Sequence, residues 1–244
     1  METSSLIFLM LAVLAASFIQ GSAGFGSALL LSPVLSLFIN NNRDITSFLV
    51  MMGLTINIIM LIRIKFEADI RQVLIMTFFS VFGILAGNYA LNFVNTYTIK
   101  IAVGIITAAT GTVLLFNYTV KLKSQKTAGG VAGFLSGFLN SAAGLSGPPV
   151  AILLSNQNIG REAFLSTIVL YSFFNNIITL ASFIFASSVT APALRFTLIN
   201  LPCVIAGTLL GIKISGKLKG PVFRKIIICM IIIIGIYLII KTIF

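Results

Sequence analysis

The chain has 244 residues, of which 58% are apolar and 9% are charged, and its formal net charge is +11. A soluble domain of this size needs many more charges on its surface, so the composition excludes a soluble globular protein. Apolar runs of roughly 17–25 residues, long enough for a helix to cross a bilayer core of about 30 Å, recur along the chain. They predict an all-α polytopic membrane protein.

The first half of the chain, residues 1–120, contains five predicted helices. The first two, at about 5–21 and 27–39, are joined by the small-residue stretch "GSAGFG" and form an interrupted helical hairpin over 5–39. Three predicted transmembrane helices follow at 46–64, 72–90 and 99–117. A basic segment, "KLKSQKT" at 121–127, is the predicted cytoplasmic linker to the second half.

The second half, residues 128–244, repeats this layout. Predicted helices at 128–142 and 148–156 flank the stretch "GLSG" and form a second hairpin over 128–156. Predicted transmembrane helices follow at 164–187, 196–214 and 224–243. Three short stretches match between the halves in the same order and at offsets of about 120–125 residues, which indicates an internal duplication: 18–24 with 138–144, 57–59 with 176–178, and 83–87 with 207–211.

The basic residues indicate how the two halves are oriented. Most Lys and Arg residues fall in the loop at 63–71, in the linker and in the loop at 213–225. Basic loops face the cytoplasm, and these three share one side only if the second hairpin adds an even number of crossings. The second half is then inverted relative to the first, and both termini are extracytoplasmic. The charges leave open whether the hairpins are re-entrant or fully spanning. Because these Lys and Arg residues lie in short loops between apolar runs, they indicate membrane orientation and not nucleic-acid binding.

The interrupted hairpins are the predicted substrate site. Inverted repeats with discontinuous helices commonly bind substrate near the bilayer midplane, and irregular backbone at that depth must be buried in protein or line a cavity. The second short helix begins near Pro148, a residue suited to the first helical turn. Each short helix therefore offers free N–H groups and a positive dipole end, which favour an anion.

The candidate substrate-binding residues are the small and polar residues of both hairpins and two matched asparagines. Asn57 and Asn176 lie midway along the helices at 46–64 and 164–187, where either an interhelical hydrogen bond or cavity lining fits. Gly83, Gly87, Gly207 and Gly211 are interpreted as helix-packing residues. The full set of candidates is Gln20, Ser22, Gly24, Phe25, Gly26, Ser27, Asn57, Asn140, Ser141, Gly144, Ser146, Gly147, Pro148 and Asn176.

Catalytic and metal-binding chemistry is not indicated. The chain has no His, and its five acids all fall in predicted loops or at the N-terminus, so no catalytic pair, metal site or cofactor site is predicted. The absence of an intramembrane carboxylate also favours an anion over a cation as substrate. Cys203 and Cys229 lie inside apolar runs without CxxC spacing, as packing residues do.

Three stretches resemble the sulfite exporter TauE/SafE family: "GSAGFGSALLLSPVL", "GFLSGFLNSAAGLSGPPVAIL" and the closing "FRKIIICMIIIIGIYLII". The resemblance covers nearly the whole chain, and its most specific part holds Gly144, Gly147, Pro148 and Pro149. It implies transport of small sulfur-containing anions, such as sulfite, thiosulfate or organosulfonates, across the bacterial inner membrane.

We therefore expect a secondary transporter, not an enzyme, that binds a small anion between the two half-helix N-termini and works by alternating access. The expected partners are the anionic substrate and the lipid bilayer. The alternatives are an anion channel and a non-transporting membrane assembly protein. The sequence leaves open which anion is carried and in which direction, which ion is coupled, and whether the chain forms a homodimer.

Overall fold

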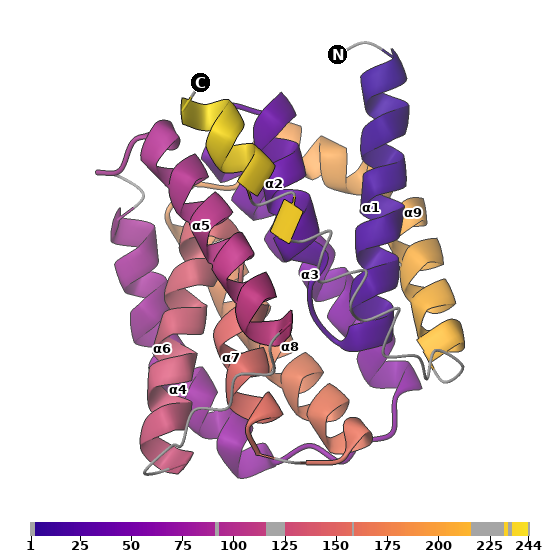
Figure 1. The fold of residues 1–244 in the computed structure, drawn as a ribbon, viewed down its shortest axis with the longest axis vertical. Coiled ribbons are helices and arrows are strands. Elements are labelled where there is room, and N and C mark those ends of the chain that lie inside the picture. The colour runs from indigo at the N-terminus through magenta and orange to yellow at the C-terminus, as the bar shows by residue number, and fades with distance from the viewer. Residues whose placement is uncertain are drawn as a thin grey trace.

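A computed structural model describes residues 3–90, 93–115, 125–157, 159–215, 232–233 and 236–243. Within these residues all regular structure is helical (Figure 1), which confirms the predicted all-α class. In this part of the chain five helices are long and apolar enough to cross a membrane: Leu6–Ala23, Asn42–Arg63, Ile70–Ala90, Arg161–Phe185 and Ala191–Ser215. The fold is therefore that of a polytopic membrane protein.

The first half folds into α1 (Thr3–Ala23), α2 (Ser27–Phe38), α3 (Asn42–Arg63), α4 (Ile70–Ala90) and α5 (Thr96–Leu115). Helix α3 begins four residues before the predicted start at 46. The reason is a cap: the side chain of Asn41 accepts a hydrogen bond of 3.1 Å from the backbone N–H of Arg43. Asparagine is among the best residues at this position, so the helix starts directly after it.

The second half folds into α6 (Gln125–Ala143), α7 (Gly147–Ser155), α8 (Arg161–Phe185) and α9 (Ala191–Ser215). Helix α6 begins inside the predicted linker at 121–127, whose residues 121–124 lie outside the described residues. Part of the helix predicted at 224–243 also lies outside them, and residues 236–243 are helical.

Each long hairpin helix packs against a helix of the other half: α1 against α9, and α6 against α4. Glycines allow the close approach. A Cβ built on Gly83 of α4 would lie 2.0 Å from the carbonyl oxygen of Phe134, and one built on Gly207 of α9 would lie 2.4 Å from that of Leu14. Gly87 and Gly211 face the next turns of α6 and α1 in the same way. The predicted packing role of these four glycines is confirmed.

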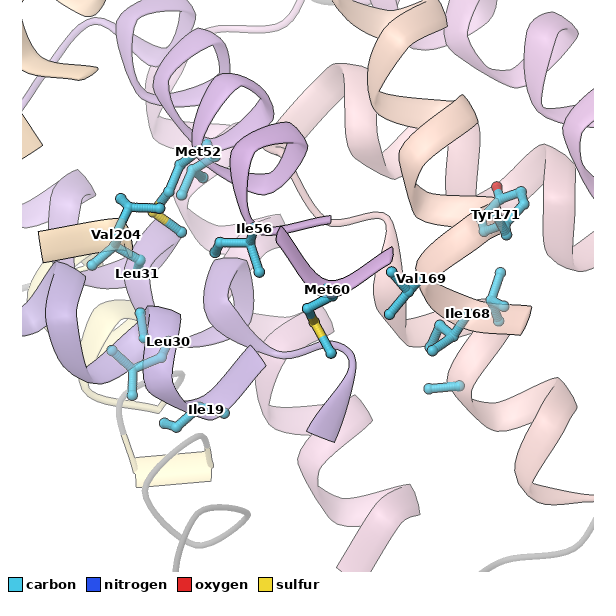
Figure 2. Close-up of a cluster of buried hydrophobic side chains, with 14 of the residues drawn as sticks. Ile19, Leu30, Leu31, Met52, Ile56, Met60, Ile168, Val169, Tyr171 and Val204 are labelled. Atoms are coloured by element: carbon cyan, nitrogen blue, oxygen red, sulfur yellow. The ribbon is translucent and has the colours of Figure 1, made fainter. Parts of the chain in front are cut away.

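The helices α3 and α8 pack against each other between the two hairpins. A buried apolar cluster joins α3 to α8 and to the short helix α2 (Figure 2). Its largest members include Met52, Ile56 and Met60 of α3 and Tyr171 of α8, each fully buried. The two halves thus share one core, and the ends of the two hairpins lie against it.

The start of α1 and the helical residues 236–243 lie at the same end of the molecule, and the connection between α3 and α4 lies at the opposite end (Figure 1). This arrangement fits a chain with an even number of crossings.

Candidate substrate site

Both long hairpin helices end at a glycine in the left-handed region. Gly24 has φ 85° and Gly144 has φ 73°. The N–H of Gly24 donates to the carbonyl of Gln20 at 2.7 Å, and the N–H of Gly144 donates to the carbonyl of Asn140 at 2.8 Å. A residue at positive φ after the last helical turn is the usual helix stop, and glycine adopts it without steric cost. The repeated glycine therefore turns the chain at the same place in each half.

The hairpin tips, residues 24–27 and 144–148, pack on the opposite halves and on each other. A Cβ on Gly24 would lie 2.9 Å from Leu165 Cδ2 of α8, and a Cβ on Gly144 would lie 2.8 Å from Leu49 Cβ of α3. A Cβ on Gly147 would lie 3.1 Å from the Cβ of Phe25. The two tips, expected to converge, are in contact.

A cavity lies between the tips, and residues of both tips line it. Its volume of about 20 Å³ is room for about one water molecule. Among its described lining residues none is charged, and the group Gln20, Ser27, Ser146 and Ser172 supplies polar side chains. The full lining is Gln20, Gly24, Phe25, Gly26, Ser27, Ala28, Leu29, Leu145, Ser146, Gly147, Pro148 and Ser172. We call it the central cavity.

Hydrogen bonds behind the central cavity in the first half run from α1 to α2 and α3. Gln20 Nε2 donates to Asn57 Oδ1 at 3.1 Å, and the hydroxyl of Ser27 donates to Gln20 Oε1. Both the nitrogen and the oxygen of the Gln20 side-chain amide are thus hydrogen-bonded, the nitrogen to α3 and the oxygen to α2. Asn57 is fully buried, and its Nδ2 has no partner among the described residues.

The second half holds the matching bond within a larger network. Asn140 Nδ2 lies 3.0 Å from Asn176 Oδ1, 3.2 Å from Asn175 Oδ1 and 3.0 Å from Thr179 Oγ1. Asn175 Nδ2 in turn donates to the hydroxyl of Tyr171 at 2.7 Å. Of the two roles open to Asn57 and Asn176, the structure shows the interhelical hydrogen bond.

The two short helices point their N-termini at the central cavity, but they are not equal anion sites. The N–H groups of Ser27, Ala28 and Leu29, in the first turn of α2, have no intrahelical acceptor. No side chain caps them either, since the N-cap residue is Gly26. Helix α7 also lacks a side-chain cap, but Pro148 and its neighbour Pro149 carry no N–H. Most of the free amides therefore belong to α2.

Eight of the candidate residues line the central cavity: Gln20, Gly24, Phe25, Gly26, Ser27, Ser146, Gly147 and Pro148. Asn57, Asn140 and Asn176 lie behind that lining, in the hydrogen bonds described above. Two others lie in helix interfaces. The hydroxyl of Ser22 donates to the carbonyl of Ile19, and its backbone faces Gly211 of α9. Ser141 faces Gly87 of α4. Gly144 packs on α3.

Sequence reasoning missed Ser172, which lines the central cavity, and Asn175 and Thr179, which bind Asn140. The signal was present: Ser172, Asn175, Asn176 and Thr179 follow the i, i+3, i+4, i+7 spacing of one helix face. A polar stripe on an apolar helix marks the face that turns toward the protein interior. The match between the two halves indicates only Asn176 of this stripe.

A membrane fold in which two hairpins bring uncapped helix N-termini to one polar cavity has the layout of a transporter. Residues 9–238 match the family model described as "Sulfite exporter TauE/SafE", and the chain belongs to this family. The search of curated proteins and the search of solved structures gave no match. The family is one of membrane exporters rather than enzymes, so it agrees with the class that the fold defines. Among the described residues, no cluster of His, Cys, Asp or Glu fits a metal ion.

Proposed function

We propose that this chain is a secondary transporter of small anions, of the sulfite or organosulfonate type, with the substrate held between the hairpin tips near the bilayer midplane. The observation that carries the proposal is the polar cavity that both tips line. The family to which the chain belongs supports the sulfur oxyanion as cargo. Partners are the anion and the bilayer, and the proposed location is the bacterial inner membrane, with both termini extracytoplasmic.

The binding chemistry fits an anion held without a buried cation. The N-terminal end of a helix acts as roughly half a positive charge, carried by its free N–H groups, so α2 supplies about half a charge and α7, which starts with prolines, supplies less. The free amides of α2, the N–H of Gly147 and the side chains of Gln20 and Ser146 can donate to sulfonate or sulfite oxygens. This supply balances part of the charge of a monoanion such as hydrogen sulfite or an alkylsulfonate, and the hydrogen bonds stabilise the rest. A dianion needs a co-bound cation or a proton.

The small volume of the central cavity favours a carrier over a channel. A space for about one water molecule does not admit an anion with three oxygens around sulfur. The tips must separate for the anion to enter, as alternating access requires. Because each tip packs on the core helix of the other half, at Leu49 and at Leu165, movement of one half against the other opens the site.

The inverted repeat is part of the same proposal. It is supported by the equivalent pairing of α1 with α9 and α6 with α4, and by the equivalent bonds Gln20–Asn57 and Asn140–Asn176. Two such halves can exchange roles on the two sides of the membrane. Homodimer formation is a separate question, which a measurement of the protein's molecular mass in detergent answers.

The test is flux of radiolabelled anion into proteoliposomes, together with thermal unfolding in a panel of sulfur anions. A transported ligand raises the unfolding temperature by mass action. A carrier shows saturable uptake that is accelerated by unlabelled anion inside the vesicle, whereas a channel does not show this acceleration. Absence of flux and of stabilisation for every sulfur anion would leave the assembly-protein alternative.

A further inference from the structure

A second and much larger cavity lies at the far end of α2 from the central cavity. It has a volume of about 520 Å³, within the usual range of small-ligand sites. Its lining comes from the end of α2 and the turn after it, the start of α5, and the helical residues 236–243: Ser36, Leu37, Asn40, Tyr97, Lys100, Leu238, Lys241 and Thr242. We call it the basic vestibule.

The charge of the basic vestibule is of one sign. Lys100 and Lys241 both line it, and none of its described lining residues is acidic. The ammonium of Lys100 donates to Asn40 Oδ1 at 3.3 Å, which holds that charge at the wall of the cavity. Asp44, the acid nearest in sequence to Asn40, accepts instead from the hydroxyl of Thr190 at 2.5 Å. Two ammonium groups without a carboxylate attract anions.

The basic vestibule lies on a line with the central cavity. Helix α2 begins at the central cavity with Ser27 and reaches the vestibule at Ser36, about 14 Å further along its axis at 1.5 Å per residue. One buried apolar cluster lies between them, formed by Leu29, Ile99, Val103, Ala143, Leu145 and Leu238. Leu29 and Leu145 also line the central cavity, and Leu238 also lines the vestibule. The cluster therefore separates the two cavities.

We propose that the basic vestibule is a second anion site, where Lys100 and Lys241 bind a soluble sulfur oxyanion on its way across the apolar cluster to or from the central cavity. This inference rests on the proposed transport function. The same chemistry fits the phosphate of an anionic lipid headgroup. We commit to the soluble anion, because the cavity lies at the end of the helix whose N-terminus faces the central cavity.

The main experiment measures initial sulfite flux in proteoliposomes of phosphatidylcholine alone. For Lys100→Ala/Lys241→Ala we expect flux at sulfite far below KM to fall roughly tenfold, because the charges raise local anion concentration. Flux at saturating sulfite should stay near that of the unchanged protein. Raising ionic strength from about 0.01 M to about 0.15 M should slow the unchanged protein and barely affect the variant, since salt screens the lysines.

Two controls separate the charge of the vestibule from other effects of the substitutions. Lys100→Arg/Lys241→Arg keeps both positive charges and should keep low-concentration flux. Arg195→Ala removes a positive charge from exposed α9 outside the vestibule and should leave it unchanged. An equal fall in Arg195→Ala, or no fall in the double alanine variant, overturns the proposal. So does a lysine effect that appears only when phosphatidylglycerol is added, since the occupant is then a lipid headgroup.

Equilibrium binding of radiolabelled sulfite to the purified protein separates this inference from the proposed function. We expect two sites per chain in the unchanged protein and one in Lys100→Ala/Lys241→Ala. If no variant transports but this loss of one site is seen, the vestibule site stands and the transporter proposal fails. If flux is normal and the number of sites is the same in both proteins, the vestibule site is wrong and the transporter proposal stands.

Discussion

Gln20 of α1 donates a hydrogen bond of 3.1 Å to Asn57 of α3, and the residues 120 and 119 positions later form the same bond. There Asn140 of α6 donates to Asn176 of α8 at 3.0 Å. Each bond ties a hairpin helix, one turn before its terminal glycine, to the core helix of its own half. Because the tips pack on the opposite halves, each tip is held from both sides, as a preorganised binding site needs.

The first prediction separates residues that line the central cavity from residues behind it. Ser146→Ala should lower sulfite affinity roughly 10–150-fold, since a hydrogen bond to a charged group contributes about 1.5–3 kcal/mol. Its unfolding temperature should change little, because its side chain caps no helix N–H. Asn140→Ala should instead lower the free energy of unfolding by about 1–3 kcal/mol, because buried acceptors on Asn176 and Thr179 lose a donor.

Calorimetric binding and thermal unfolding of the purified variants measure both effects. Gln20 lines the cavity and also donates to Asn57, so Gln20→Ala should lower both the sulfite affinity and the unfolding temperature. Unchanged affinity in Ser146→Ala and Gln20→Ala, with loss of binding in Lys100→Ala or Arg195→Ala, would mean that a basic residue forms the principal site.

A second prediction concerns the helix stops. Gly144→Ala should lower the free energy of unfolding by about 1–3 kcal/mol, because a side chain at positive φ is strained and its Cβ meets Leu49 at 2.8 Å. Gly160→Ala is the matched control, with φ −61° and no atom within 4 Å of the added Cβ. It should lower the free energy of unfolding by less, at most about 1 kcal/mol, which is the cost of alanine in place of glycine at the N-cap of α8. Equal effects of the two substitutions would contradict the assigned geometry.

The third prediction tests the two equivalent helix interfaces. Gly83→Ala and Gly207→Ala should each destabilise by about 1–3 kcal/mol, since the added carbon meets a backbone carbonyl that cannot move alone. Gly129→Ala on α6 is the control: its Cβ would lie 3.6 Å from Ile75, an ordinary contact. It should be neutral or stabilise by up to about 1 kcal/mol. Thermal unfolding gives the ranking, and a more harmful Gly129→Ala would refute it.

Much of the fold could be predicted because each element has a local cause. Apolar runs predict the helices, and basic loops predict the connections between them. Gly24 and Gly144 end the two long hairpin helices. The early start of α3 was missed although its capping residue, Asn41, stands in the sequence. The pairing of α1 with α9 could not be predicted, because small residues such as Gly207 and Gly211 show that a helix packs closely but not against which partner.

The site was predictable where the chain is interrupted and less so elsewhere. Both tips stood out as small-residue breaks, and they do line the central cavity. The direction of each side chain did not follow from the sequence: the hydroxyl of Ser22 bonds back to its own helix and Ser141 turns toward α4, whereas Ser172 faces the cavity. The small number of free amides at the start of α7 could be predicted from Pro148 and Pro149, since proline has no N–H.

The fourth prediction is the orientation. The start of α1 and the residues 236–243 lie at one end of the molecule, opposite the basic connection that contains Lys65 (Figure 1). Because basic loops face the cytoplasm, a reporter fused after Phe244 should be active only if it works outside the cytoplasm. A fusion after Lys65 serves as the opposite control. Activity of a cytoplasm-only reporter at Phe244 would rule out the proposed inverted topology.

The last prediction tests whether the tips must separate during transport. In a background of Cys203→Ser and Cys229→Ser, the pair Phe25→Cys and Gly147→Cys places two thiols across the contact between the tips. The Cβ positions are 3.1 Å apart, and a disulfide needs about 3.5–4.5 Å, so a shift of roughly half an ångström admits the bond. Oxidation should stop flux, and a reductant should restore it. Flux is measured with an organosulfonate, because sulfite itself cleaves disulfides.

Each single cysteine variant should have the same flux before and after oxidation, which separates the cross-link from damage by the oxidant. Mass spectrometry of the oxidised protein establishes that the bond has formed. A carrier whose substrate enters between the tips cannot work with them joined, since the central cavity then stays near the volume of one water molecule. Full flux through a protein shown to be cross-linked would mean that the anion follows another path, and both the central site and alternating access at the tips would have to be abandoned.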